Sequence, residues 1–115
     1  MRRLCLRRGD IWLADLPSGT GDVLRGVHPV IVVSSDQTNR RSGIVTVVPL
    51  TSASKPPMPC HVPVVGFGLR KESVALAEQI TTLPKERLRF RLGSLEGSRE
   101  LEEVGRAIRQ QLEVA

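Results

Sequence analysis

The sequence contains 115 residues, of which 40% are hydrophobic and only 3% aromatic, and its formal net charge is +5. A chain of this length suffices for one domain with a modest core, so we expect residues 1–115 to form a single domain. The scarcity of aromatic residues argues against an aromatic platform that stacks single-stranded bases. No hydrophobic run approaches the ~18 residues of a membrane span, so we expect no membrane partner.

The distribution of charge points to a polyanionic partner. Residues 1–93 carry fourteen Lys and Arg against seven Asp and Glu, whereas residues 94–115 carry three Arg and five Glu. A basic body of this kind attracts nucleic acid or an acidic peptide. The alternative is an ordinary solvated surface in a basic proteome.

The two cysteines and the N-terminal residues indicate a cytoplasmic protein. Cys5 and Cys60 form no CxxC pair, which fits a reducing compartment better than a disulfide-stapled secreted domain. The opening MRRLCLRR is basic but lacks the apolar segment of a signal peptide. Because two Cys and two His at irregular spacing match no zinc pattern, we expect no metal site and no cofactor.

The first half of the chain reads as three strands. Residues 11–16 form the first strand, and the Gly-rich residues 17–26 that follow form a flexible loop. Two runs rich in Val, Ile and Thr, residues 28–34 and 43–50, are nearly continuous in apolar residues, so both faces of this strand pair should be covered. The polar residues 35–42 between them have the composition of an exposed loop.

The middle of the chain is less regular. Prolines in residues 51–59 predict a loop, and residues 60–65 a short strand. Residues 73–80 are compatible with a helix or a strand. In residues 85–92 four cations alternate with mostly apolar residues: on a strand they would share one face, and in a helical turn after Pro84 they would scatter.

The last segment predicts an amphipathic helix. Leu101, Val104, Ile108 and Leu112 are spaced as one stripe of a helix, and Ser98 is the expected N-cap. We therefore expect a small, strongly curved antiparallel sheet covered by a C-terminal helix.

Three stretches together resemble the MazF/PemK family of toxin endoribonucleases, whose fold is shared with the CcdB-type toxins. They are RRGDIWLADL, GVHPVIVVSSD…NR…IVTVVPLTS and SVALAEQITTLPKERL, in the family's order. The resemblance implies a mainly β, α+β fold, namely a small SH3-like antiparallel β-barrel closed by a C-terminal α-helix. It also implies a homodimer in a type II toxin–antitoxin system, inhibited by a cognate antitoxin with an acidic tail.

The implied activity is metal-independent, sequence-specific cleavage of single-stranded RNA through the substrate's 2′-hydroxyl, giving a 2′,3′-cyclic phosphate. Such cleavage needs a base, an acid and charge stabilisation at phosphorus. In the family, an Arg before the core Pro and the Thr of the P-L-T motif carry most of this work. Thr51 matches that Thr, but His28 stands where the family usually has Arg.

The histidine has three interpretations. In the first, His28 transfers protons, since an imidazole titrates near neutrality, while Arg25 holds the phosphate. In the second, the site has lost its catalytic cation, and the protein is a non-catalytic CcdB-like toxin or an RNA-binding module. In the third, His28 is a strand-edge residue hydrogen-bonded to a backbone carbonyl.

Loops 17–26 and 51–59 leave the same side of the central strand pair, so we expect them to flank one groove shared by RNA and antitoxin. His61 is a candidate second histidine for an acid–base pair. Glu78 and Gln79 either read bases, cross a dimer interface or make structural hydrogen bonds. The full set of RNA-binding candidates is Ser52, Arg40, Arg70, Lys71, Glu78, Gln79 and His61.

Overall fold

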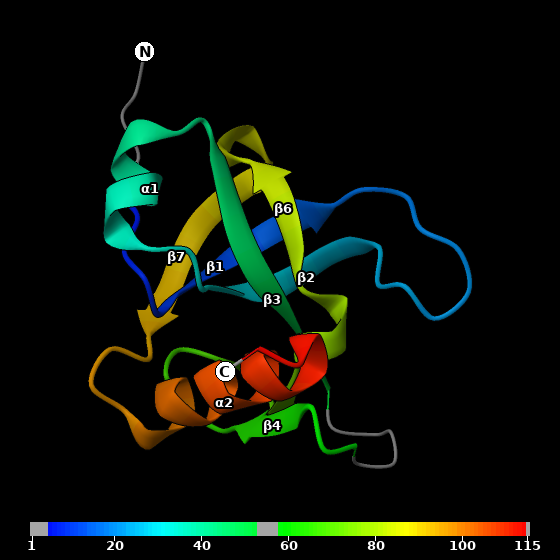
Figure 1. The fold of residues 1–115 in the computed structure, drawn as a ribbon. Helices are drawn as coiled ribbons and strands as arrows, with labels where there is room; N and C mark the ends of the chain where they lie inside the picture. The colour runs from blue at the N-terminus through cyan, green and yellow to red at the C-terminus, as the bar shows by residue number, and fades with distance from the viewer. Residues whose placement is uncertain (1–4, 53–57, 115) are drawn as a thin grey trace.

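The computed structural model describes residues 5–52 and 58–114. This part of the chain forms a mainly antiparallel sheet with a C-terminal helix (Figure 1). Its strands are β1 (Asp10–Leu16), β2 (Gly26–Val32), β3 (Ile44–Ser52), β4 (His61–Val64), β5 (Ser73–Leu76), β6 (Thr81–Pro84) and β7 (Leu88–Ser94). Its helical elements are α1 (Asp36–Arg41), α2 (Arg99–Leu112) and the 3₁₀ turns η1 (Ala77–Gln79) and η2 (Lys85–Arg87).

The sheet is open. Its strand order is β4-β5-β3-β2-β1-β7, with β6 also paired to β3. No pairing among the described residues joins β4 to β7, so the closed barrel that the resemblance implies is not formed by hydrogen-bonded strands. Instead α2 follows β7 and packs against β4 and η1, where its buried Val104 and Ala107 cover the core.

The central strands are buried on both faces, as their apolar sequences predict. Alternate residues of β2 and β3 enter two core clusters: Ile31 and Val48 belong to one, and Val30 and Val47 to the other. The first cluster includes α2 residues, and the second includes residues of β1, β6 and β7. Two covered faces explain why these strands show no polar alternation.

The segment between β2 and β3 contains a short helix, so the prediction of a loop over residues 35–42 was wrong, although most of these residues are exposed as predicted. Ser35 caps α1, because its hydroxyl accepts a hydrogen bond from the Thr38 N–H. Asn39 is buried, and its amide is bonded to the hydroxyl and the carbonyl oxygen of Ser34. A buried amide with these partners fixes the helix on the sheet.

The two ambiguous segments each contain both kinds of structure. Residues 73–80 form β5 followed by η1, and residues 85–92 form η2 followed by most of β7. The turn η1 falls beside the part of β3 between its pairings with β6 and β5. Pro49 lies in that part of β3, and a proline has no N–H to donate to a ladder.

The alternating cations of residues 85–92 do not form one free face. Lys85 Nζ donates to the backbone oxygen of Asn39. Arg89 donates two hydrogen bonds, of 2.9 and 2.8 Å, to the Asp15 carboxylate on β1. Arg91 lies 3.4 Å from the buried Asp10 carboxylate. These three cations therefore connect η2 to α1 and β7 to β1.

The C-terminal helix follows the prediction closely. The Ser98 hydroxyl accepts a hydrogen bond of 3.1 Å from the Leu101 N–H, so Ser98 is the N-cap. Leu112, the last member of the predicted stripe, is 52% exposed, and Ala107 is buried instead. No helix in the described ranges is long and apolar enough to cross a membrane.

Candidate functional site

One end of the central strand pair gathers the principal candidate residues. The two strands are antiparallel, with Val30 paired to Pro49, so β2 begins and β3 ends at the same end of the strand pair. Carrying that register two residues further would set His28 opposite Thr51. The β2–β3 ladder stops before that point, and β3 goes on to pair with β5 through Leu50, Thr51 and Ser52. In Figure 1 the β1–β2 loop extends from this end, away from α1.

His28 and Arg25 are linked through the backbone of the β1–β2 loop. The Nε2 atom of His28 lies 3.0 Å from the carbonyl oxygen of Arg25. Since a carbonyl oxygen only accepts, Nε2 carries the hydrogen, and in the neutral ring the free lone pair is on Nδ1. This carbonyl contact is the one that the strand-edge interpretation predicts, and it leaves Nδ1 available for proton transfer.

The side chain of Arg25 is exposed and partly engaged. Its Nη1 donates a hydrogen bond of 3.2 Å to the carbonyl oxygen of Gly19, in the same loop. Within residues 5–52 and 58–114, Arg25 forms no ion pair. A guanidinium has five N–H donors in a fork that matches a phosphate, so the remaining donors can hold one.

Thr51 and Ser52 are the last residues of β3 and therefore belong to a strand, not to the loop that the sequence predicted at residues 51–59. Ser52 pairs with Ser73, the first residue of β5. Arg70 and Lys71 are exposed in the turn that leads into β5, so the pairing brings this turn beside the end of β3. The remainder of that predicted loop includes residues 53–57, which lie outside the described residues.

Arg40 lies at the other end of the strand pair. It is exposed in the last turn of α1, which follows the C-terminal end of β2, whereas Arg25 precedes the start of β2. Figure 1 shows α1 and the β1–β2 loop at opposite ends of β2. The structure therefore separates Arg40 from the other candidates in the same subunit.

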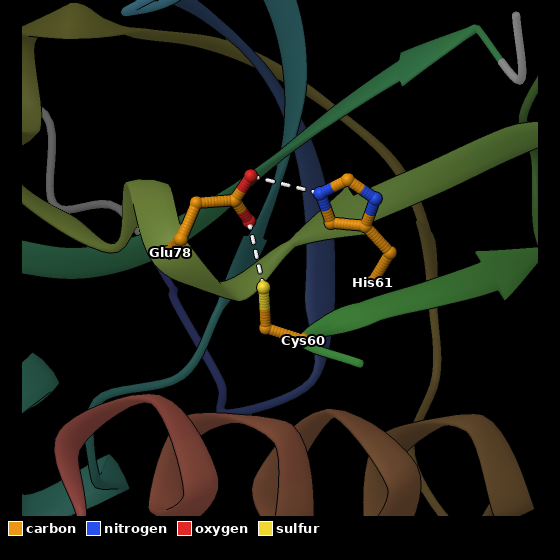
Figure 2. A group of neighbouring side chains, drawn as sticks. All are labelled: Cys60, His61 and Glu78. Carbon is orange, nitrogen blue, oxygen red and sulfur yellow. Dashed lines mark hydrogen bonds and ion pairs between the residues drawn. The ribbon is translucent and has the colours of Figure 1, made fainter. Parts of the chain in front are cut away.

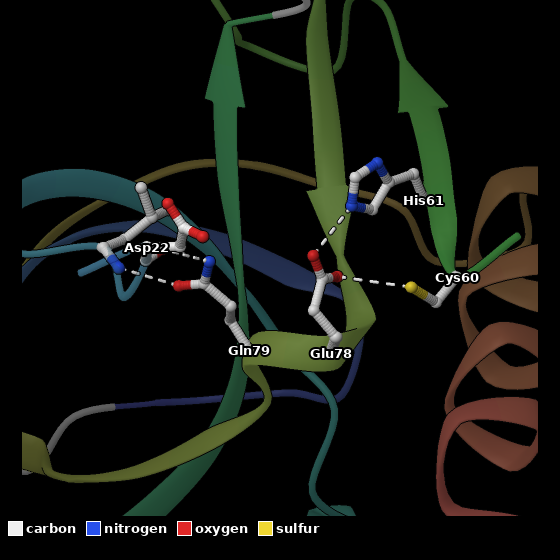
Figure 3. A network of polar contacts seen from close by, with 6 residues as sticks. Asp22, Cys60, His61, Glu78 and Gln79 are labelled. Atoms are coloured by element: carbon white, nitrogen blue, oxygen red, sulfur yellow. Dashed lines mark hydrogen bonds and ion pairs between the residues drawn. The ribbon is translucent and has the colours of Figure 1, made fainter. Parts of the chain in front are cut away.

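Gln79 anchors the β1–β2 loop (Figure 3). Its Oε1 accepts a hydrogen bond of 2.7 Å from the Leu24 N–H, and its Nε2 donates one of 2.8 Å to the Asp22 carbonyl oxygen. The side-chain amide of Gln79 thus hydrogen-bonds to a backbone N–H and a backbone carbonyl of the loop, as the backbone of a neighbouring strand would. Of the alternatives for Gln79, the structural hydrogen bond is the one present here, and it fixes the loop immediately before Arg25.

Glu78 faces the opposite direction and joins Cys60 and His61 (Figure 2). Its Oε2 lies 2.8 Å from His61 Nε2, and its Oε1 accepts a hydrogen bond of 3.5 Å from the Cys60 thiol. The partner of His61 is therefore Glu78, whereas that of His28 is a backbone carbonyl. The two histidines do not share a hydrogen bond.

The contacts within this cluster shift the pKa values of Cys60 and Glu78. Burial raises the pKa of the Cys60 thiol, and the adjacent Glu78 carboxylate raises it further. Burial also tends to raise the pKa of Glu78, but hydrogen bonds from His61, the backbone and Cys60 outweigh burial, so the net shift of this pKa is downward. The carboxylate is thus held ionised and the thiol protonated. Sequence reasoning assigned no role to Cys60, because nothing in linear spacing links it to Glu78.

Comparisons with known proteins agree with this architecture. The family model described as PemK-like, MazF-like toxin of type II toxin–antitoxin system matches residues 7–112. The chain is 40% identical over 100 residues to Endoribonuclease MazF of Staphylococcus epidermidis, covering 84% of this chain and 83% of that protein. It is 39% identical over 106 residues to Endoribonuclease MazF of Staphylococcus saprophyticus, covering 90% and 88%.

Solved structures share the fold. An endoribonuclease in complex with its cognate antitoxin from a mycobacterial species superposes with a TM-score of 0.79 at 24% identity, over 96% of this chain and 97% of that one. MazF from Deinococcus radiodurans gives a TM-score of 0.78 at 24% identity, over 94% and 96%. These similarities support the mainly β, α+β fold with its C-terminal helix.

Proposed function

Because the chain belongs to the PemK-like, MazF-like toxin family of type II toxin–antitoxin systems, we propose that it is an endoribonuclease whose reaction is carried by Arg25, His28 and Thr51. The assignment is supported by the antiparallel pairing of β2 with β3, because it puts the start of β2, with Arg25 just before it and His28 in it, at the same end of the strand pair as Thr51 at the end of β3. The substrate is single-stranded RNA, and residues 1–115 act as one toxin domain.

The reaction uses the substrate's own nucleophile. The 2′-oxygen bonds to phosphorus as the bond from phosphorus to the 5′-oxygen breaks, which leaves a 2′,3′-cyclic phosphate and a 5′-hydroxyl. The proton of the 2′-hydroxyl goes to a base, and the departing 5′-oxygen takes a proton from a water molecule. No activated protein nucleophile is required.

His28 accepts the 2′-hydroxyl proton at Nδ1 in this proposal. The contact between its Nε2 and the Arg25 carbonyl supports that role, because it fixes the tautomer and orients the ring. A neutral imidazole then presents one lone pair, as a general base must. This role takes the place of the arginine that the family usually has at position 28.

Arg25 and Thr51 stabilise the phosphate. The exposed Arg25 guanidinium offers its remaining N–H donors to the non-bridging oxygens, on which charge develops. The half-buried Thr51 supplies a hydroxyl at the rigid end of β3. Ser52, Arg70 and Lys71 extend the same end as contacts for the RNA backbone.

We further propose that the toxin works as a cytoplasmic homodimer and is inhibited by a cognate antitoxin. Solved neighbours include an endoribonuclease in complex with its cognate antitoxin and a MazE–MazF complex of Deinococcus radiodurans. An acidic antitoxin segment would meet the same cations as RNA does, because both ligands are polyanions.

The test is incubation of the purified toxin with mixed single-stranded RNA in EDTA, followed by sequencing of new 5′ ends. We expect cleavage at one short sequence and loss of activity in His28→Ala. His28→Arg, which places the family's usual residue at position 28, should change the rate only modestly.

The same experiment distinguishes the alternatives. RNA that is bound but left intact by the wild-type protein would identify a non-catalytic binder, and cleavage gained in His28→Arg would identify a degenerate site. Unchanged cleavage and unchanged stability in His28→Ala would remove His28 from the mechanism.

A further inference from the structure

Three side chains with different ligating atoms meet where β4 begins: the thiol of Cys60, the imidazole of His61 and the carboxylate of Glu78 (Figure 2). From this geometry we propose that the protein binds Zn²⁺ through these three residues. The proposal goes beyond the endoribonuclease activity and involves none of Arg25, His28 and Thr51. It also revises the expectation of no metal site, which considered only spacing along the sequence.

The distances suit one small cation. The three ligand atoms all lie within 4.8 Å of one another. Bonds of ~2.0–2.3 Å in tetrahedral geometry separate ligand atoms by ~3.3–3.7 Å. The contact of 3.5 Å from Cys60 Sγ to Glu78 Oε1 already has that length, and the contact of 2.8 Å from His61 Nε2 to Glu78 Oε2 must lengthen. Side-chain movements on the order of 1 Å complete the site.

The backbone around the cluster is already in place. Strands β4 and β5 pair with His61 opposite Leu76, and the Ala77 N–H donates a hydrogen bond of 3.2 Å to the Cys60 carbonyl oxygen. Cys60 also packs in the core cluster that contains the buried residues of α2. Because strand pairing and core packing already hold this backbone, a metal can bind without ordering the chain first.

The kinds of ligand select the ion. One thiolate, one imidazole and one carboxylate form a set that suits Zn²⁺ or Co²⁺, whereas Mg²⁺ takes oxygen ligands. Binding releases the thiol proton to solvent, together with any proton on His61 Nε2. The relative exposure of the side chains of His61 and Glu78 is 7% and 24%, so the site opens on the Glu78 side. Three protein ligands leave the fourth position of a tetrahedron for water.

The test uses the full chain in a thiol-free reductant, with Zn²⁺ alone and with Co²⁺ as a spectroscopic probe. We expect one Zn²⁺ per chain, a rise in Tm on Zn²⁺ addition, and a thiolate-to-Co²⁺ charge-transfer band. Cys60→Ser should abolish the band and weaken Zn²⁺ binding at least about tenfold. Mg²⁺ should produce neither the band nor the rise in Tm.

The chain provides its own matched controls, because it contains two cysteines and two histidines. Cys5→Ser and His28→Ala should bind Zn²⁺ as the wild type does, whereas Cys60→Ser and His61→Ala should not. The proposal is overturned if the wild type shows no stoichiometric binding or no charge-transfer band. It is also overturned if the control variants lose as much affinity as Cys60→Ser. The band belongs to the unaltered protein, so it tests the site even where a variant fails to fold.

Discussion

Glu78 and Gln79 occupy successive positions of one 3₁₀ turn, yet their side chains bind segments on opposite sides of it (Figure 3). Gln79 holds the backbone of the β1–β2 loop at Asp22 and Leu24, and Glu78 holds Cys60 and His61 at the start of β4. The turn η1 therefore connects the loop that carries Arg25 to the cluster beside α2. A substitution of Gln79 should therefore loosen the β1–β2 loop, and a substitution of Glu78 should loosen the start of β4, each without affecting the other segment.

Gln79→Ala should loosen the β1–β2 loop. It removes two hydrogen bonds to the loop backbone, each of which contributes about 0.5–1.5 kcal/mol. We expect faster hydrogen exchange at the Leu24 amide and slower RNA cleavage, with His61 and Cys60 unaffected. Gln110→Ala, at an exposed position of α2, is the matched control and should change neither measurement. An unchanged Leu24 exchange rate would show that Gln79 does not hold the loop.

Thr51→Ala should separate activity from stability. The hydroxyl lies at the half-buried end of β3, so its loss should cost the fold less than about 1 kcal/mol. If Thr51 stabilises the phosphate, cleavage should fall by a factor on the order of 10². Thr82→Ala, on β6, should leave the rate unchanged. Full activity with native stability in Thr51→Ala would exclude Thr51 from the site.

The ion pair of Asp15 and Arg89 should make stability depend on pH in the acid range. The hydrogen bond from Arg89 lowers the pKa of Asp15 below its ordinary 3.8. A lowered folded-state pKa stabilises the fold above the unfolded value, and this contribution is lost as the pH falls through the folded value. Asp15→Asn should therefore unfold more readily than wild type at pH 7, with the difference vanishing below the folded pKa.

Chemical denaturation of the two proteins at several pH values measures this effect. Glu72→Gln, which removes an exposed carboxylate from the turn between β4 and β5, is the control and should show no such convergence. The pair is exposed to solvent, so high salt should reduce the difference at pH 7. A pH-independent difference between wild type and Asp15→Asn would contradict the assignment.

Gly93→Ala should destabilise the fold through a direct clash. A Cβ atom at Gly93 would lie 1.9 Å from the Phe67 carbonyl oxygen, and one at Gly68 would lie 2.0 Å from the Leu92 carbonyl oxygen. The two backbones are therefore in contact, and we expect a loss of about 1–3 kcal/mol or more in the free energy of unfolding. Gly43→Ala meets nothing within 4 Å and should change stability by less than about 1 kcal/mol. Equal stabilities of the two variants would contradict this packing.

The sequence predicted the features that depend on local pattern. The apolar runs located β2 and β3, and the spacing of Leu101, Val104 and Ile108 with the Ser98 cap located α2. It missed α1, because six polar residues carry no apolar stripe and the helix depends on the burial of Asn39. It also left residues 73–80 undecided, since a strand that turns into η1 follows neither period throughout.

The candidate site was predictable only in part. The resemblance indicated His28, Thr51 and the η1 residues. The antiparallel pairing of β2 and β3 explains why His28 and Thr51 lie toward the same end of the strand pair. The hydrogen bond from His28 to the Arg25 carbonyl and the meeting of Cys60 with Glu78 depend on how separate segments pack. Contacts of that kind leave no periodic signal in a single sequence.

The pairing of β1 with β7 sets the order in which a newly made chain can fold. Leu13 pairs with Phe90, and Asp10 pairs with Ser94, so the first strand lacks one of its two neighbours until nearly the last strand residue has been synthesised. Contacts between such distant positions form late, because a long loop must close first. A ribosome translating this toxin therefore carries an incomplete sheet through most of the coding sequence. The edge of β1 that faces β7 therefore stays unpaired until residue 94 has been synthesised.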